Sequence, residues 1–327
     1  MKRRLTTVAL TLALGLAALP PASATAPGAN GKIAFMRGDR IVLSDPDGGN
    51  VSGLSLPYPS FTPVWSPDGS RILVTAFTPG GVRPATVDPD GSDFALLDVK
   101  ATSDFEIHCR AWSPDGRRLL CQGIRFEGDH SMDGVYSIRA SDGGDLTRLT
   151  VNPFPPTGQF GGGDIPGDYS PDGTRFVFMR AKPGADPNAR HQQGALFVAN
   201  VDGSGLHRIT PYGLANSHDN GLARWSPDGR RIVFASAHGL LFVVHTEGTG
   251  LRRIPLETRG DWYFASTPDW SPDGTAIIFS LNVFHGLVGH EDIYTARVDG
   301  RQLSQVTHTA NRFEDFADWG THPWGAV

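Results

Sequence analysis

The string Trp-Ser-Pro-Asp-Gly recurs along the chain and constrains its fold more than any other feature. Four copies are identical, a fifth has Tyr169 in place of Trp, and a sixth is reduced to Trp319 and its two neighbours. The five longer copies occupy residues 65–69, 112–116, 169–173, 225–229 and 270–274. The aromatic residues of the six copies are 45 to 57 residues apart. Self-similarity at this period is typical of solenoids and propellers, in which each repeat is one supersecondary unit.

A second marker, an Asp-Gly or Glu-Gly turn that leads into a shorter apolar strand, has six copies that alternate with the first. Its copies lie at residues 47–48, 90–91, 142–143, 202–203, 247–248 and 299–300. Short runs rich in Val, Ile, Leu and Phe separate the markers, and no run has a long helical period, so the runs are predicted strands. Each repeat then has four strands, called A to D, with the aromatic anchor on strand A. The sequence predicts an all-β fold, a six-bladed β-propeller with four antiparallel strands per blade.

The two ends of the chain predict how the ring closes. The first unit has strands B, C and D, at residues 32–37, 40–44 and 51–56, and lacks strand A. The last unit, which ends at Trp319, has strand A alone. Together they make one complete blade, so both termini are expected to build the sixth blade and to leave no exposed sheet edge at the seam.

The Ser-Pro-Asp-Gly part of the string predicts a tight turn between strands A and B. Pro sets φ at the second position of a type I turn, Asp tolerates the third, and Gly accepts the left-handed conformation that follows. A three-residue loop of this kind pairs Ser113 with Arg117, so residues whose numbers total 230 face each other in the second blade. Cys109 and Cys121, the only two cysteines, satisfy that total. In an exported chain this register favours a disulfide over two free thiols, with a stabilisation of at most about 3 kcal/mol.

The N-terminus has the features of a secretory signal peptide. A basic start at residues 2–4 precedes an apolar stretch over residues 5–19 and a run of small residues at 22–24. The apolar stretch is shorter than the about 20 residues that a membrane-spanning helix needs, which argues against an anchor. We expect cleavage after Ala24, with Ala26 as the next choice.

The expected organisation is a signal peptide over residues 1–24, a linker over 25–30 and one propeller over 31–327, in a secreted or periplasmic protein. Signal removal would make the chain more acidic, because three of the 29 Lys and Arg lie at residues 2–4 and all 34 Asp and Glu lie beyond the predicted signal. An acidic chain argues against nucleic acid or an anionic membrane as a partner, since both favour Lys and Arg. No other stretch is apolar enough to span a membrane, and we expect a monomer.

These motifs resemble the WD40-like repeats of the TolB-type propeller family. The shared features are the Trp-Ser-Pro-Asp-Gly strings, the Asp-Gly turns, the Leu-x-x-Leu-Thr strands and the ending Asp318-Trp319-Gly320-Thr321-His322-Pro323. The resemblance extends from about Gly31 to Pro323 and implies a propeller of the TolB type. The α/β domain that precedes the propeller of TolB itself, and with it a role in the Tol–Pal complex, is not expected here, because the repeats begin shortly after the predicted cleavage site. The repeat also resembles propellers that cap peptidases of the prolyl oligopeptidase type, but the chain has no Gly-x-Ser-x-Gly string.

The strand order assigns the connections to two faces of the ring. The short, uniform A–B and C–D turns share one face, here called the turn face. The B–C loops and D–A crossovers, which hold nearly all the variation in length, share the opposite face, here called the loop face. Long loops are predicted at residues 123–134, 151–167, 181–194 and 282–291. Binding residues concentrate in variable loops on rigid scaffolds, so the loop face is the expected binding face.

Acidic and histidine residues fall in the crossovers that lead into the innermost strands, which line the central channel. We predict that they surround the channel mouth with negative charge and bind a cationic group, a basic peptide segment or a metal such as Ca²⁺, which prefers oxygen ligands. The candidates are Asp104, Glu106, His108, Asp164, His218, Asp219, Asp261, Glu314 and Asp315. For each residue alone the alternative is a solvated or turn-capping side chain.

Trp262 and Tyr263 precede the anchor of the fifth blade and break the repeat. They are either an exposed stacking platform at the mouth or filler in a longer crossover, whereas the repeated Trp anchors are expected to pack between blades. Four histidines also fall in predicted B–C loops, but their spacing matches no metal-binding motif, which favours scattered loop residues. They are His130, His191, His285 and His290.

The sequence favours a non-catalytic binding or scaffold propeller for an extracytoplasmic protein, a peptide or a small ligand, with no required cofactor. The alternative is a metal-assisted lyase or hydrolase acting on an extracellular polymer. That activity requires several of four residues to converge on one ion, namely His108, His218, Asp219 and Asp261. A peptidase regulator without its catalytic partner is a third hypothesis.

Overall fold

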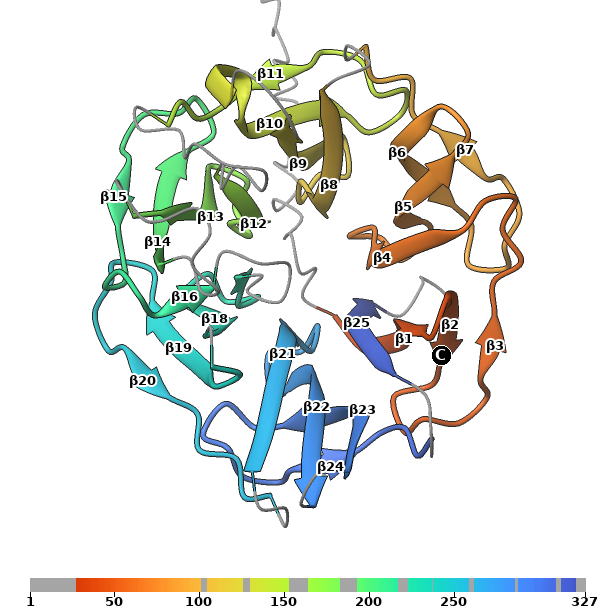
Figure 1. The fold of residues 1–327 in the computed structure, drawn as a ribbon, viewed down its shortest axis with the longest axis vertical. Helices are drawn as coiled ribbons and strands as arrows, with labels where there is room; N and C mark the ends of the chain where they lie inside the picture. Colours follow the sequence, from red (N-terminus) through yellow and green to blue (C-terminus); the bar gives the residue numbers. More distant parts are fainter. Residues whose placement is uncertain are drawn as a thin grey trace, which may run out of the picture.

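The fold was examined in a computed structural model. It describes residues 28–100, 105–125, 130–152, 164–182, 193–216, 223–236, 238–258, 262–285, 288–309 and 313–321. Their strands form six antiparallel sheets arranged as blades around a central channel (Figure 1). The predicted six-bladed propeller is therefore confirmed. Among the described residues, no helix has the length and apolarity needed to cross a bilayer.

Five blades are each built from one contiguous stretch of chain, with strand A innermost and a two-residue strand D at the rim. Blade 1 contains β4 (Ser60–Trp65), β5 (Ile72–Thr78), β6 (Gly81–Val87) and β7 (Ala95–Leu96). Blade 2 contains β8 (Glu106–Trp112), β9 (Arg118–Ile124), β10 (Gly134–Arg139) and β11 (Thr147–Arg148), with the 3-10 helix η1 (His130–Met132) between β9 and β10. Blade 3 contains β12 (Ile165–Tyr169), β13 (Arg175–Ala181), β14 (Gln193–Asn200) and β15 (His207–Arg208), and a fifth strand, β16 (Ala215–Asn216), pairs with β14. Blade 4 contains β17 (Arg224–Trp225), β18 (Arg231–Ala235), β19 (Leu241–His245) and β20 (Arg252–Arg253). Blade 5 contains β21 (Trp262–Trp270), β22 (Ile277–His285), β23 (Val288–Ala296) and β24 (Ser304–Gln305).

The sixth blade combines both ends of the chain, as predicted. Its innermost strand is β25 (Glu314–Thr321), which pairs with β1 (Asn30–Arg37), and β2 (Arg40–Ser44) and β3 (Ser52–Gly53) complete it. Figure 1 shows the blue C-terminal strand beside the red N-terminal strands. The indole Nε1 of Trp319 donates to the carbonyl of Gly31 at 3.1 Å, which ties the two ends together inside the blade.

The A–B turns differ from the prediction by one residue. In each complete copy of the repeated string, the Ser N–H donates to the carbonyl five residues on, as Ser113 does to Arg118 at 2.8 Å. Four residues therefore form the loop, and the predicted pairing of Ser113 with Arg117 is wrong. A bulge at Arg110 in β8 then restores the predicted register, so that Cys109 faces Cys121.

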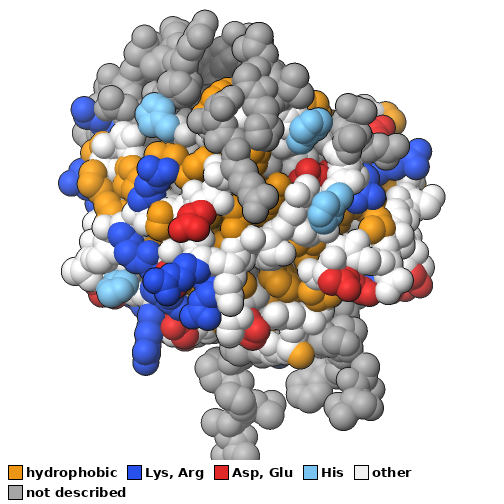
Figure 2. Space-filling model, turned by 90° about the horizontal axis from the view of Figure 1, so that it is seen from below, with side chains coloured by type: hydrophobic (Ala, Val, Ile, Leu, Met, Phe, Trp, Pro, Cys, Tyr) orange, Lys and Arg blue, Asp and Glu red, His pale blue; other side chains and the backbone are white. Residues whose placement is uncertain are grey.

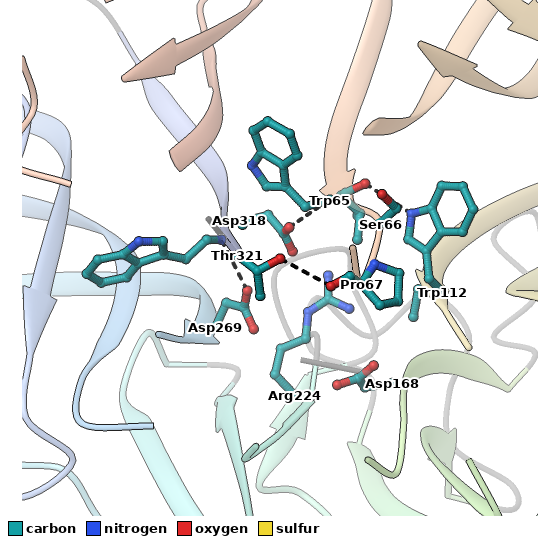
Figure 3. A pocket seen from close by; sticks show the side chains of 13 residues that line it. Trp65, Ser66, Pro67, Trp112, Asp168, Arg224, Asp269, Asp318 and Thr321 are labelled. Carbon is teal, nitrogen blue, oxygen red and sulfur yellow. Dashed lines mark hydrogen bonds between the residues drawn. The ribbon is translucent and has the colours of Figure 1, made fainter. Parts of the chain in front are cut away.

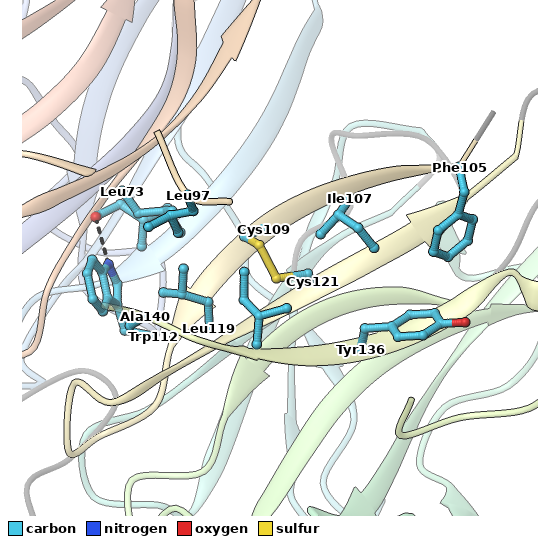
Figure 4. Packing of buried hydrophobic residues seen from close by; sticks show 12 residues of the cluster. Leu73, Leu97, Phe105, Ile107, Cys109, Trp112, Leu119, Cys121, Tyr136 and Ala140 are labelled. Atoms are coloured by element: carbon cyan, nitrogen blue, oxygen red, sulfur yellow. Dashed lines mark hydrogen bonds between the residues drawn. A yellow bond between two sulfur atoms is a disulfide. The ribbon is translucent and has the colours of Figure 1, made fainter. Parts of the chain in front are cut away.

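The predicted disulfide between Cys109 and Cys121 is present and joins β8 to β9. Both cysteines are buried, and Figure 4 shows the bond inside the apolar cluster between blades 1 and 2, beside Ile107 and Leu119. The cross-link thus lies within the packed interface and not at its surface.

One predicted loop is mostly strand. Residues 282–291 extend β22 and β23, and the two strands pair as far as His285 opposite Val288. These strands and β21 have nine residues each, so the hairpins of blade 5 are the longest among the described residues. His285 and His290 lie on them, whereas His130 begins η1 and His191 lies outside the described residues. The other predicted long loops fall partly outside the described residues.

The aromatic anchors pack between blades, as expected. Trp225 and Trp270 are fully buried, and Arg side chains of the preceding blade lie over their rings, Arg175 at 5.3 Å and Arg231 at 4.8 Å from the ring centroids. Stacking a guanidinium on a buried indole combines apolar burial with a cation–π contact. The anchors therefore hold the blades in a ring.

Candidate functional site

Eleven residues were predicted to form a binding site at the channel mouth, and the structure describes seven of them. Asp104, His218, Asp219 and Asp261 lie outside the described residues. The other seven lie near the loop-face ends of their blades, because each one begins or immediately precedes a strand A. They are Glu106, His108, Asp164, Trp262, Tyr263, Glu314 and Asp315.

Glu106 and His108 form a pair on β8. They are two residues apart and so share a face of the strand, and Nε2 of His108 lies 2.9 Å from Oε2 of Glu106. Both side chains are half-buried. The carboxylate of Glu106 is therefore held against the imidazole of its neighbour on the same face of the strand.

Asp164 and Glu314 are neutralised inside the protein. The buried Asp164 makes a bidentate ion pair with Arg180, at 2.7 Å to Nε and 2.6 Å to Nη2. Oε1 of the fully buried Glu314 accepts from Nε of Arg37 at 2.5 Å. Glu314 pairs with Arg37 across neighbouring strands, and Arg180 lies one pair beyond the Ile165–Met179 pair. Strand register was thus the signal that could have located both partners.

Asp315 lies at the centre of a hydroxyl cluster between blades 5 and 6. Its Oδ1 accepts from the hydroxyls of Thr267 and Ser280, each at 2.6 Å, and from its neighbouring backbone N–H of Phe316 at 2.8 Å. The negative charge of Asp315 acts on Glu291, which lies on β23. Burial, together with the carboxylates of Asp315 and Asp292, raises the pKa of Glu291 to about 7. Sequence reasoning missed Glu291 because it was assigned to a loop rather than to a strand facing blade 6.

Trp262 and Tyr263 begin the long strand β21. The indole of Trp262 stacks on Phe284 of the paired strand, with ring centroids 3.6 Å apart and planes 8° from parallel, and 52% of the residue is exposed. The hydroxyl of Tyr263 accepts from Nη2 of Arg253 at 2.6 Å. Phe284 thus supports one face of the indole at the end of the projecting hairpin.

Large exposed apolar side chains gather on the loop face. Five of them lie at five positions around the ring. Trp262 begins a strand A, Val151 and Phe313 lie in D–A crossovers, Met132 lies in a B–C connection, and Phe77 lies near the loop-face end of β5. The largest exposure among them is that of Phe313, at 69%. Exposed aromatic and apolar groups on one face are characteristic of interaction surfaces.

A cavity of about 940 Å³ opens on blade 5, beside the crossover that leads from blade 4. Its apolar part includes Leu281, Val283 and Tyr294, and its polar part includes His290 and His308. Figure 2 views the ring from the side of these blades and shows apolar side chains between charged and histidine side chains at the surface. The carboxylate of Asp292 in the cavity wall accepts hydrogen bonds from Gln305, Thr307 and Thr309.

The channel itself is closed by an ionic cluster that the sequence analysis did not identify. The residue before each aromatic anchor faces the channel, and a bulge just before the anchor helps to direct it there in five of the blades. These six residues are Val64, Ala111, Asp168, Arg224, Asp269 and Asp318. Figure 3 shows the guanidinium of Arg224 reaching into the space between the three aspartates.

Aspartates of this cluster link their own blades to the blades that follow. Oδ2 of Asp318 accepts from the backbone N–H of Trp65 at 2.7 Å, and Oδ2 of Asp168 accepts from that of Trp225 at 3.1 Å. Nη1 of Arg224 donates to the carbonyls of Arg110 and Gly167 at 3.0 and 3.2 Å. The space left between these groups is about 30 Å³, enough for one or two water molecules.

Burial governs the protonation of this cluster. It raises the pKa of Asp168 to about 7, although the nearby Arg224 acts in the opposite direction. Burial also raises the pKa values of Asp269 and Asp318, and their mutual repulsion adds to the effect at Asp318. Burial alone would lower the pKa of Arg224, but the three carboxylates outweigh it and raise that pKa. The aspartates of the cluster therefore hold their protons to a higher pH than exposed aspartates do, beside one guanidinium.

The arrangement of the described residues offers no metal centre. Among them, no group of three or more His, Cys, Asp or Glu side chains is placed to hold a metal ion. Of the four residues invoked for a metal-assisted reaction, only His108 belongs to the described part, where it contacts Glu106. The metal-assisted reaction stays a prediction for the remaining three, as does Ca²⁺ binding by the acidic residues of the channel mouth.

Fold and site together define a six-bladed β-propeller with an ionically closed channel and an apolar loop face. No family model matches the chain. A segment of 139 residues is 31% identical to the protein TolB homolog of Chlorobium luteolum; it covers 42% of this chain and 28% of that relative.

Solved structures extend the likeness to the whole ring. TolB from Acinetobacter baumannii superposes with a TM-score of 0.64 at 17% identity, covering 89% of this chain and 67% of its own. A putative TolB from Agrobacterium tumefaciens superposes with a TM-score of 0.61 at 16% identity, covering 89% of this chain and 98% of its own. At these identities the likenesses show the fold, so the chain has the fold of the TolB propellers on which it superposes.

Proposed function

We propose that the protein is an exported, non-catalytic binding propeller that holds an extracytoplasmic protein partner on its loop face. The observation that carries the proposal is the set of exposed apolar side chains on that face, above all Trp262 and Phe313. Large aromatic groups are the residues that most often dominate protein–protein binding energy.

The charged groups beside this set support a partner with a basic segment. Asp164 and Glu314 are paired with arginines inside the fold, whereas Glu291 and Asp315 have no arginine or lysine partner among the described residues. A Lys or Arg of the partner would relieve the repulsion between these two carboxylates while its apolar neighbours contact Trp262.

Two features support export. The N-terminal residues 1–24 have the composition of a signal peptide, and the chain forms a disulfide, which persists in oxidising compartments outside the cytoplasm. The engagement of the described acidic residues in internal contacts supports a binding role over a catalytic one.

The test is quantitative capture from the envelope fraction and culture fluid of the producing cells. Trp262→Ser and Phe313→Ser are compared with wild type and with Leu206→Ser, a matched control at a residue of blade 3 that is 45% exposed and lies away from the loop face. We expect the first two variants to lose at least about tenfold of a specific captured protein, and the control to retain it. Equal capture of the same proteins by all four chains would refute the proposal.

A further inference from the structure

A cavity of about 440 Å³ opens between blades 2 and 3 on the turn face, opposite the proposed partner surface. The A–B turns of both blades contribute Pro114, Asp115 and Asp172, and the rest of its wall includes Leu149 and Val201. Its volume lies within the range of sites that bury a small organic molecule.

The cavity lies at the one repeat whose aromatic anchor is Tyr instead of Trp. Tyr169 is buried, and its hydroxyl lies 3.2 Å from Oγ of Ser137. A phenol has less volume than an indole, so this interface lacks part of the ring system that the Trp anchors supply elsewhere. The exchange of one residue in the repeat therefore adds to a cavity that the other wall residues of both blades also shape.

The preceding interface shows the same surroundings with the indole present. Between blades 1 and 2, Nη2 of Arg71 donates to Thr86 at 3.1 Å and to the carbonyl of Asp93 at 2.7 Å, and Trp112 fills the anchor position. At the cavity, Arg118 is held in the same way.

Nε of Arg118 donates to Oγ of Ser137 at 2.6 Å, and its Nη2 donates to the carbonyl of Asp145 at 2.9 Å. The guanidinium of Arg118 is thus hydrogen-bonded within blade 2, as that of Arg71 is within blade 1. The anchor itself is Trp112 at one interface and Tyr169 at the other.

The cavity edge carries two carboxylates. Oδ1 of Asp115 and Oδ1 of Asp172 close their own turns by accepting from Ser113 and Ser170, each at 2.6 Å. In the described residues, Oδ2 of neither group is used by a hydrogen bond. Arg118 brings one positive charge to the wall and the two aspartates bring two negative charges, so the balance favours a cation that carries a ring.

We propose that this cavity binds a small aromatic amine. Its ring lies in the cavity beside Tyr169, and its ammonium group faces the Oδ2 atoms of Asp115 and Asp172. This site is separate from the loop face and adds a small-molecule function to the partner binding proposed above.

The experiment uses three probes with one ring system: tryptamine, uncharged indole and indole-3-acetate. Binding to the full chain is measured by calorimetry and by ligand-observed NMR. We expect tryptamine to bind at least about tenfold more tightly than indole-3-acetate, because the carboxylates attract the ammonium group and repel the acid. Absence of tryptamine binding at millimolar concentration, or equal affinity for the two charged probes, overturns the proposal.

Variants of the chain test the origin and the chemistry of the site. Tyr169→Trp restores the repeated anchor and is expected to lower tryptamine affinity at least about tenfold while leaving protein capture unchanged. Val201→Trp, which fills the cavity from blade 3, serves if Tyr169→Trp does not fold. Asp115→Asn with Asp172→Asn keeps the turn hydrogen bonds and is expected to remove the preference for tryptamine over indole. Wild-type tryptamine affinity in the folded, cavity-filling variants contradicts the assignment.

Discussion

At the scale of single residues, the aspartates before the aromatic anchors make stability depend on pH. Burial raises the pKa of Asp168 to about 7 in the folded chain from its ordinary value of 3.8. The folded state therefore binds this proton more tightly, and the resulting stabilisation is fully present below pH 3.8 and is lost as the pH rises through about 7. Asp168→Asn keeps an oxygen that can accept from the N–H of Trp225 and removes the titration.

The free energy of unfolding, measured in urea, should thus fall in wild type between pH 5 and pH 8. This fall should exceed that of Asp168→Asn by about 2–3 kcal/mol. Titration of the histidines is common to both chains and cancels in the comparison. Asp39→Asn, which changes an exposed turn residue, is the control and should follow wild type. Identical slopes for wild type and Asp168→Asn would show that the buried carboxyl does not titrate in this range.

The same position shows what the sequence could and could not reveal. Every Trp anchor was predictable, because its role is the same in each repeat. The residue before it varies from Val64 to Arg224 to Asp318, so nothing repeats to draw attention to it. Its role depends on the strand bulges and on the meeting of blades far apart in sequence. Arg180 and Arg37 were missed as partners for a related reason, since an ion pair across strands follows only from the register.

At the scale of secondary-structure elements, the repeated string correctly predicted the hairpin between strands A and B. The predicted loop was one residue too short. The extra loop residue and the bulge at Arg110 compensate each other, which is why the pairing of Cys109 with Cys121 was still predicted. The type I turn pattern alone did not give the loop length, which depends on side-chain hydrogen bonds. Oδ1 of Asp115 accepts from the N–H of Arg117, and Oγ of Ser113 accepts from that of Arg118. The same limit applies to β22 and β23, whose extension through the predicted loop depends on pairing with each other.

The disulfide between β8 and β9 gives the prediction at this scale. The cysteines are 12 residues apart, so the closed loop is short. Reduction should lower the free energy of unfolding by at most about 3 kcal/mol and leave the ring folded, because the hairpin is also held by its turn and its apolar cluster. Urea unfolding with and without dithiothreitol measures the loss, and the Cys109→Ala, Cys121→Ala double variant should not respond to the reductant. Collapse of the reduced chain to an unfolded state would mean that the cross-link, and not the packing, maintains blade 2.

At the scale of the whole molecule, the number of blades and the shared sixth blade followed from the sequence because both are counted from repeats. Ring closure concentrates several contacts on β25. Asp318 accepts from the backbone of Trp65, Trp319 donates to Gly31, and Thr321 donates to the carbonyl of Pro67. Blade 1, blade 5 and the N-terminal strands all meet this one segment, so its removal should affect the entire ring and not only one sheet.

A chain that ends before residue 313 should therefore lose the cooperative unfolding transition of the full ring. Without β25, the edge of β1 has unpaired backbone groups, and an uncovered edge strand promotes association. We expect the truncated chain to be oligomeric by light scattering, and a synthetic peptide of residues 310–327 to restore a monomer. The same peptide with Trp319→Ala is the control and should restore it poorly, because truncation of a buried Trp costs about 3–5 kcal/mol. A truncated chain that stays monomeric and unfolds like the full ring would show that the five remaining blades and the N-terminal strands hold together without the seam.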